Sequence, residues 1–340
     1  VLATGMLLCI LTGGNIDLSV GSVVCFVGAV GGVFMEKMGM PMPIAVILML
    51  LLGAVIGAWQ AVWIAYVHVP PFITTLSGMF VFRGLSNVVL GGQTLPIKNQ
   101  AFVVLFGGGA NCYVPDILGG GEGMNRLALV VGVVACVIFV VVTMKGYLNR
   151  KKKGYETGNV AAMYMKMILI CAVILFITYK LAKYKGIPTS LVWVLIVVLI
   201  YGYITSKTTI GRYFYAVGGN EKATKLSGIN TERVYFLAYT NMGLLSALAG
   251  MLTIARLTSA QPTYGQNYEM DAIGSCFIGG ASAYGGTGTV PGVIIGATLM
   301  GIINQGMSIM GTDQNMQKVV KGLVLLAAVI FDVVSKKRSE

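Results

Sequence analysis

The stretch KTTIGRYFYAVGGNEKATKLSGINTER, residues 207–233, is the longest polar interval between apolar spans in the second half of the chain. Five basic side chains are distributed along it. A Gly-Gly-Asn sequence at its centre predicts a tight turn, and a short helical run follows and stops at a glycine. The residues of this turn and helix are Gly218, Gly219, Asn220, Glu221, Ala223, Leu226 and Gly228.

The composition around this stretch is that of a membrane protein. Of the 340 residues, 56% are hydrophobic and only 11% are charged, whereas soluble domains are about 25% charged. So much apolar surface requires a bilayer, which helices of roughly 20 apolar residues cross. The 46 glycines suit close helix packing in lipid. We therefore predict an all-α, polytopic transmembrane bundle that forms a single domain over residues 1–340.

About 10–11 membrane spans are visible at roughly 20 residues each. The chain opens at Val1 inside an apolar run, so we expect that the true start and one more span are missing. The expected spans are 18–35, 44–66, 72–90, 127–144, 163–182, 191–204, 234–254, 272–283, 290–310 and 319–334.

Basic residues between the spans predict the orientation. Placing 145–153 in the cytoplasm and counting crossings puts 207–233 and 336–338 on the same side, as the positive-inside rule requires. The Gly-rich segment 91–126 then lies outside as a periplasmic loop. Lys180, Lys183 and Lys185 fall on the outer side, against the rule. The net charge of +12 therefore reflects topology, and we expect no nucleic acid partner.

Polar side chains inside an apolar span predict a face toward the bundle interior. The span 72–90 carries several of them, and another group precedes the span 18–35. Two alternatives stay open: Arg83 snorkels to the outer interface, and Asn15 to Asp17 form a helix N-cap. The candidate substrate-pathway residues are Thr74, Thr75, Ser77, Arg83, Asn87, Asn15, Asp17 and Ser19.

Motifs that the sequence lacks exclude several functional classes of protein. The sequence has no phosphate-binding loop, no hydrolase motif and no metal-type spacing of its six cysteines, so we expect no enzyme, no metal site and no cofactor. Asp17, Glu269, Asp271 and Asp313 stand at span ends, which argues against ion coupling. The short helix within residues 207–233, on the side of the membrane where the basic segments lie, is then where a partner protein would drive transport. An ion-driven carrier or channel for a small polar solute is the alternative.

Four runs carry a resemblance to a known family. The chain resembles the ribose/xylose-type permeases of bacterial ABC importers over nearly its whole length. This resemblance implies a monosaccharide permease of the inner membrane that works as a homodimer. Its implied partners are cytosolic ATPase subunits, which hold ATP and Mg, and a periplasmic or lipid-anchored sugar-binding protein. The runs are GGNIDLSVGS (13–22), PPFITTLSGM (70–79), GRYFYAVGGNEKATKLSGIN (211–230) and GGTGTVPGVIIGA (285–297).

The same resemblance assigns a role to the central stretch. Residues 216–228 would be the coupling loop that docks into a groove of the ATPase subunit, with the glycines in its turn and Glu221 and 223–226 in the contact. The insert 154–188 is similar to that of the longer xylose and multiple-monosaccharide permeases.

Overall fold

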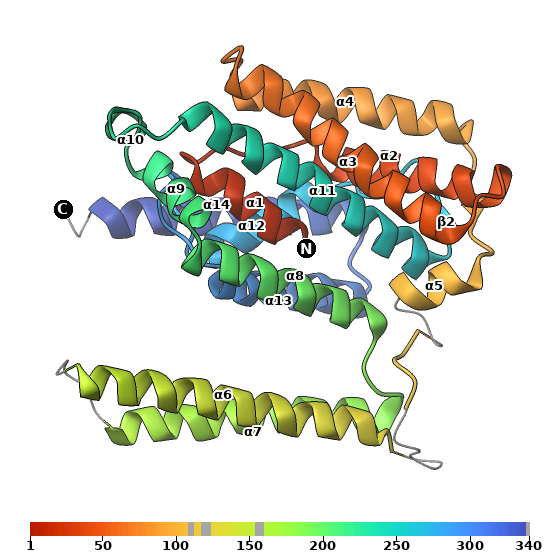
Figure 1. Cartoon of the computed structure of the whole chain (residues 1–340). Helices are drawn as coiled ribbons and strands as arrows, with labels where there is room; N and C mark the ends of the chain where they lie inside the picture. Colours follow the sequence, from red (N-terminus) through yellow and green to blue (C-terminus); the bar gives the residue numbers. More distant parts are fainter. Residues whose placement is uncertain (108–111, 117–123, 154–159, 338–340) are drawn as a thin grey trace. The chain divides into compact units, whose positions relative to one another are not determined.

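The computed structural model describes residues 1–107, 112–116, 124–153 and 160–337. The chain divides into two compact units. Unit 1 comprises residues 1–109 and 193–340, and unit 2 comprises residues 110–192. Figure 1 shows the helices of both. The single domain expected from the sequence stays a prediction.

The first half of unit 1 is a series of helices, in which prolines lie at helix starts and a glycine lies at a helix end. Pro43 and Pro71 each lie in a first turn, where the missing N–H costs nothing. Gly91 ends a helix with φ 61°. The elements are α1 (Leu2–Leu11), α2 (Val20–Gly32), a π-helical turn η1 (Val33–Lys37), α3 (Met42–Ala65), α4 (Pro71–Leu90), β1 (Leu95–Pro96) and α5 (Gln100–Phe106).

The second half begins with α8, whose first residues belong to unit 2. Its elements are α8 (Thr189–Lys207), α9 (Thr209–Gly219), α10 (Glu221–Leu226), α11 (Thr231–Leu257), β2 (Ser259–Ala260), α12 (Tyr268–Ile278), α13 (Val290–Ile309) and α14 (Gln314–Lys337). The short strands β1 and β2 pair antiparallel, with Leu95 opposite Ala260.

Helix α11 is the centre of unit 1 and packs against α3, α2 and α1. Tyr239 and Met242 on α11 are fully buried. The approach to α3 is close because glycines face each other: a Cβ on Gly243 would lie 2.2 Å from the Gly53 carbonyl oxygen, and one on Gly57 would lie 2.5 Å from the Tyr239 oxygen. Small residues bring membrane helices together in this way.

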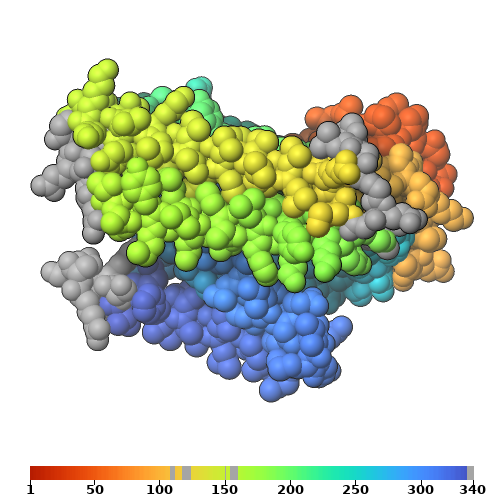
Figure 2. Space-filling view, turned by 90° about the horizontal axis from the view of Figure 1, so that it is seen from below, coloured from red at the N-terminus to blue at the C-terminus, as the bar shows by residue number. Residues whose placement is uncertain are grey.

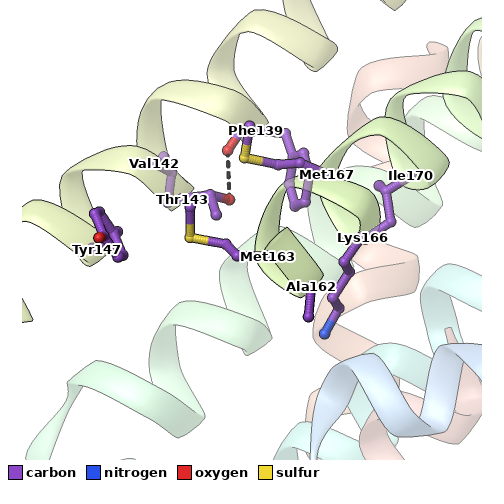
Figure 3. A pocket seen from close by; sticks show the side chains of 10 residues that line it. Phe139, Val142, Thr143, Tyr147, Ala162, Met163, Lys166, Met167 and Ile170 are labelled. Atoms are coloured by element: carbon purple, nitrogen blue, oxygen red, sulfur yellow. Dashed lines mark hydrogen bonds between the residues drawn. The ribbon is translucent and has the colours of Figure 1, made fainter. Parts of the chain in front are cut away.

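Unit 2 is a helical hairpin of α6 (Arg126–Lys152) and α7 (Val160–Tyr184), with a small core of Ala128, Ala182 and Ile187. Figure 2 shows the two helices side by side, in yellow and green. A groove of about 700 Å³ lies between them. Figure 3 shows its mainly apolar lining, with Thr143 donating a hydrogen bond to the Phe139 carbonyl.

Eight helices within the described residues are long and apolar enough to cross a membrane. They are α2 with η1, α3, α4, α6, α7, α8, α11 and α13. The predicted all-α, polytopic class is confirmed. The separate span predicted at 272–283 is wrong: α12 has 11 residues and ends before Gly280, whose φ is 83°, so it is too short to span.

Candidate coupling segment and polar interior

Three polar caps build the central stretch. The side chains of Thr208, Asn220 and Asn230 accept the backbone N–H of Gly211, Ala223 and Arg233, at 3.1, 2.9 and 2.9 Å. Each cap satisfies an N–H that the first turn of a helix leaves unpaired, and so fixes where α9, α10 and α11 begin. The polar stretch is therefore two short helices leading into a long one.

The structure confirms the predicted short helix and corrects the predicted turn. Helix α10 covers Glu221–Leu226 and stops before Gly228, whose φ is 82°. The glycines Gly218 and Gly219 do not form the turn, because both are helical and end α9. The chain turns at Asn220, which has an extended backbone with φ −161°.

Gly218 is required by close packing instead. A Cβ there would lie 1.8 Å from the Leu11 carbonyl oxygen and 2.5 Å from the Gly286 nitrogen. The Gly286 N–H also donates a hydrogen bond of 3.1 Å to the Leu11 oxygen. The end of α9 thus rests directly on the end of α1 and on the loop after α12.

Further glycines surround this contact. A Cβ on Gly285 would meet Gly13 Cα at 2.5 Å, and one on Gly14 would meet the Ala283 oxygen at 2.0 Å. We call Gly13, Gly14, Gly218, Gly285 and Gly286 the glycine junction. Three segments far apart in sequence meet there backbone to backbone, so a push of α9 toward α1 also acts on the other two segments.

Hydrogen bonds from side chains hold the junction and α10 in place. The Tyr215 hydroxyl donates to the Gly288 oxygen at 2.8 Å, and the Ala283 N–H donates to Asp332 Oδ2 of α14 at 3.1 Å. The Tyr235 hydroxyl of α11 donates to Glu221 Oε2 at 3.1 Å. A short helix tied to α9, α11 and the junction can transmit force to the bundle.

The outer face of α10 is exposed. Leu226 is 89% exposed, although it is apolar, and Glu221 and Ala223 are exposed beside it. Lys222 and Lys225 flank them. An apolar residue at the tip of a fixed polar helix suits docking into a groove of another protein.

A second group of predicted residues forms a buried polar cluster. Asp17 and Ser19 lie between α1 and α2 and are 2% and 0% exposed. Asp17 Oδ1 accepts the Ser19 N–H at 2.8 Å and the Ser19 hydroxyl at 2.7 Å, and Gln60 Nε2 of α3 donates to Ser19 Oγ at 2.8 Å. Gly78 of α4 leaves room for Gln60, since a Cβ there would lie 2.4 Å from Nε2.

Sequence reasoning missed Gln60, although a lone amide inside the apolar run 44–66 is the signal that finds it. The N-cap alternative for Asn15 and Asp17 is not what the structure shows. Asn15 Nδ2 donates to the Thr12 oxygen at 3.3 Å, and no side chain caps the first turn of α2. Asp17 instead orders the turn before the helix.

The remaining pathway candidates lie along α4. Thr74 and Thr75 are buried and hydrogen-bond the Pro70 and Pro71 oxygens one turn back, at 3.4 and 2.9 Å. Ser77 and Asn87 are exposed and do not join the buried cluster.

Arg83 is half-buried and has a structural contact. Its Nη1 donates to the carbonyl oxygens of Pro262 and Tyr264, at 3.1 and 2.6 Å. It therefore ties α4 to the loop between β2 and α12 and does not extend to an interface, as the snorkelling alternative required.

Comparisons with known proteins identify the family. The model of the branched-chain amino acid transport system permease component matches residues 1–329. The chain is 34% identical over 339 residues to the xylose transport system permease protein XylH of Escherichia coli K12, covering 100% of this chain and 83% of that protein. It is 36% identical over 338 residues to XylH of Haemophilus influenzae, covering 99% and 86%.

The ribose import permease protein RbsC of E. coli K12 is 34% identical over 335 residues, covering 98% of this chain and 81% of that protein. No solved structure matches the chain. The chain belongs to this family of transport permease components. The resemblance seen in the sequence is confirmed, and so is the expected localisation in the inner membrane, given the eight apolar helices.

Proposed function

We propose that this protein is the membrane-spanning subunit of an ABC importer that moves a monosaccharide of the xylose or ribose type into the cell, with ATP hydrolysed by a separate cytosolic subunit. The observation that carries the proposal is α10, fixed through Asn220, Tyr235 and the glycine junction, with Leu226 exposed at its tip. The relatives named for xylose and ribose transport support the substrate class.

In this proposal two permease copies and two ATPase subunits assemble, and a periplasmic or lipid-anchored binding protein delivers the sugar. ATP and Mg bind the ATPase subunits, and no cofactor is needed in this chain. When the ATPase subunits close, each pushes on one α10. Because α10 is hydrogen-bonded to α9, and α9 contacts the end of α1 and the loop after α12, the push reaches the helices around the buried Asp17 cluster.

Replacing Leu226 by aspartate tests the docking helix. Loss of an apolar anchor in an interface costs about 2 kcal/mol or more, roughly thirtyfold in affinity. We expect co-purification of the ATPase subunit and ATP-driven uptake to be lost in Leu226→Asp, with membrane insertion unchanged. Met38→Asp is the matched control, since Met38 is 59% exposed in the turn after η1. Normal ATPase binding by Leu226→Asp would contradict the proposal.

The burial of Asp17 favours the alternative function, an ion-driven carrier, because such carriers bury an acidic residue. Asp17→Asn separates the two. The amide oxygen still accepts from Ser19, so we expect ATP-driven uptake in proteoliposomes to stay within about twofold of wild type. The alternative would be established if the wild-type permease imported the solute without the ATPase subunit and if Asp17→Asn abolished that uptake.

A further inference from the structure

A polar pocket lies at the end of unit 1 opposite the coupling segment. It has a volume of about 460 Å³, within the range of roughly 300–1,000 Å³ typical of small-molecule sites. One wall is the loop 261–268 and the other is the first two turns of α14. It is lined by Gln261, Thr263, Tyr264, Gly265, Gln266, Asn267, Tyr268, Gln314, Gln317, Lys318 and Lys321. We call it the amide pocket.

The position of the amide pocket follows from α14. Gln314 lines the pocket, and Asp332 of the same helix accepts the Ala283 N–H beside the glycine junction. The 18 residues between them rise about 27 Å, close to the thickness of the bilayer core of about 30 Å. Helix α11, one of the eight helices able to cross a membrane, also runs from the coupling segment to the residues just before the loop wall, so the pocket and the coupling segment lie at opposite ends of a membrane-crossing helix.

The loop wall is rigidly built. Arg83 donates to the Pro262 and Tyr264 oxygens, and the Ser259 and Tyr264 hydroxyls hydrogen-bond each other at 2.7 Å. Gly265 packs backbone to backbone on α2, since a Cβ there would lie 2.2 Å from the Gly21 oxygen. Asn267 adopts φ 65°, a left-handed conformation that asparagine tolerates better than most residues with a side chain.

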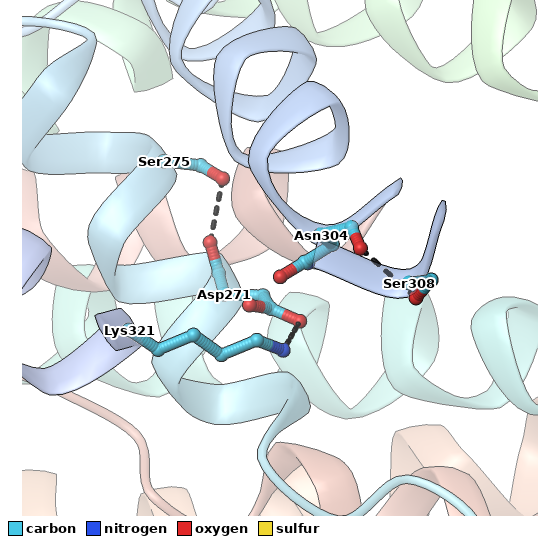
Figure 4. Close-up of polar contacts among 5 residues, drawn as sticks. All are labelled: Asp271, Ser275, Asn304, Ser308 and Lys321. Atoms are coloured by element: carbon cyan, nitrogen blue, oxygen red, sulfur yellow. Dashed lines mark hydrogen bonds and ion pairs between the residues drawn. The ribbon is translucent and has the colours of Figure 1, made fainter. Parts of the chain in front are cut away.

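The helix wall is fixed as well. Figure 4 shows Lys321 Nζ of α14 reaching Asp271 Oδ2 of α12, at 2.9 Å. The other carboxylate oxygen, Asp271 Oδ1, is buried and has no hydrogen-bond partner. Lys321 lines the amide pocket and Tyr268 lines both this pocket and a second cavity of about 320 Å³ that also contains Asp271. An unpaired buried acceptor is costly, and a hydroxyl group would satisfy it.

The lining chemistry selects a class of ligand. Amide side chains both donate and accept hydrogen bonds, tyrosines offer ring faces and hydroxyls, and none of the lining residues that the structure describes is acidic. Lys321 is already paired with Asp271, which leaves Lys318 as the pocket cation with no ion pair within the described chain. Most of the wall is made of amide, hydroxyl and ring groups, which match the hydroxyl groups of a polyhydroxylated molecule, and Lys318 can donate to one of those hydroxyls.

We propose that the amide pocket is the entry subsite, where a neutral monosaccharide released by the binding protein first contacts the permease. This inference rests on the proposed function and adds the residues that recognise the substrate. Arg83 is a positioning residue in it, holding the loop wall without touching sugar. The Lys321–Asp271 pair stands between this subsite and the second cavity.

The test is ATP-driven uptake of xylose and of ribose by proteoliposomes that contain the permease, its ATPase subunit and the binding protein. Gln266→Ala with Gln314→Ala removes two amides, one from each wall, and both residues are exposed, so folding is spared. We expect the uptake rate at subsaturating sugar to fall roughly tenfold. Gln93→Ala is the matched control, an exposed glutamine outside the pocket.

A second variant fills the amide pocket. Gln314→Trp should block uptake of both sugars while ATPase-subunit binding and basal ATP hydrolysis stay at wild-type level. Wild-type uptake rates in both pocket variants would overturn the entry subsite and leave the proposed function standing. Faster uptake of a uronate than of the neutral sugars would overturn the assigned ligand class. Failure of the wild-type protein to import with ATP would reject the proposed function itself.

Discussion

Gly218→Val is expected to abolish ATP-driven uptake. A Cβ at this position would lie 1.8 Å from the Leu11 carbonyl oxygen. The three nearest atoms, from Leu11 and Gly286, all belong to the backbone, so no rotamer change relieves the clash. The end of α9 must lift from α1 and from Gly286. Overpacking typically costs about 1–3 kcal/mol, and a clash with fixed backbone lies at the top of that range or beyond it.

The neighbouring glycine supplies the control. Nothing lies within 4 Å of a Cβ on Gly219, so Gly219→Val makes the same chemical change one residue later in the same helix. We expect Gly219→Val to keep uptake near wild type and Gly218→Val to lose at least nine tenths of it. The measurement is the initial uptake rate in proteoliposomes, normalised to inserted permease.

The two variants also distinguish between the interpretations of this Gly-Gly pair. If the glycines served a sharp turn, both substitutions would be harmful. If they serve close packing, only Gly218→Val is. Equal loss in the two variants would contradict the packing account, and so would Gly218→Val transport at the wild-type rate.

The sequence predicted those features of the fold that depend on residues close together along the chain. Apolar length located most of the long helices, and Gly228 located the end of the short helix α10. The helix begins at Glu221, two residues before the predicted run 223–226, because Asn220 caps it. Local pattern failed where the reason was a distant partner. Gly218 looks like a turn residue in the sequence, because neither Leu11 nor Gly286 is near it along the chain.

The polar residues of the span 72–90 show the same limit. Their number indicated correctly that one face of the helix is buried, as Thr74 and Thr75 are. Periodicity could not say that Arg83 binds the carbonyls of a loop some 180 residues away, or that Gln60 would join Ser19. Which backbone oxygen meets a long side chain depends on helix packing, which a single sequence does not encode locally.

Gly243→Val is expected to destabilise unit 1 more than any other change considered. Its Cβ would lie 2.2 Å from the Gly53 oxygen and 2.7 Å from the Gly57 backbone, at the contact where the central helix α11 meets α3. The helices must separate, and the fully buried Tyr239 and Met242 lose contacts on the same helix. We expect a loss of about 3 kcal/mol or more.

The measurement is thermal unfolding of the purified permease in detergent. Domains of 150–250 residues lose roughly 2–4 °C in Tm per kcal/mol, so Gly243→Val should lower Tm by more than about 6 °C or fail to accumulate in the membrane. Gly84→Val is the control, because nothing lies within 4 Å of a Cβ on Gly84 of α4. Valine favours helix over glycine by a few tenths of a kcal/mol, so this variant should be as stable as wild type. Equal Tm values for the two variants would show that α11 and α3 do not depend on glycine for their approach.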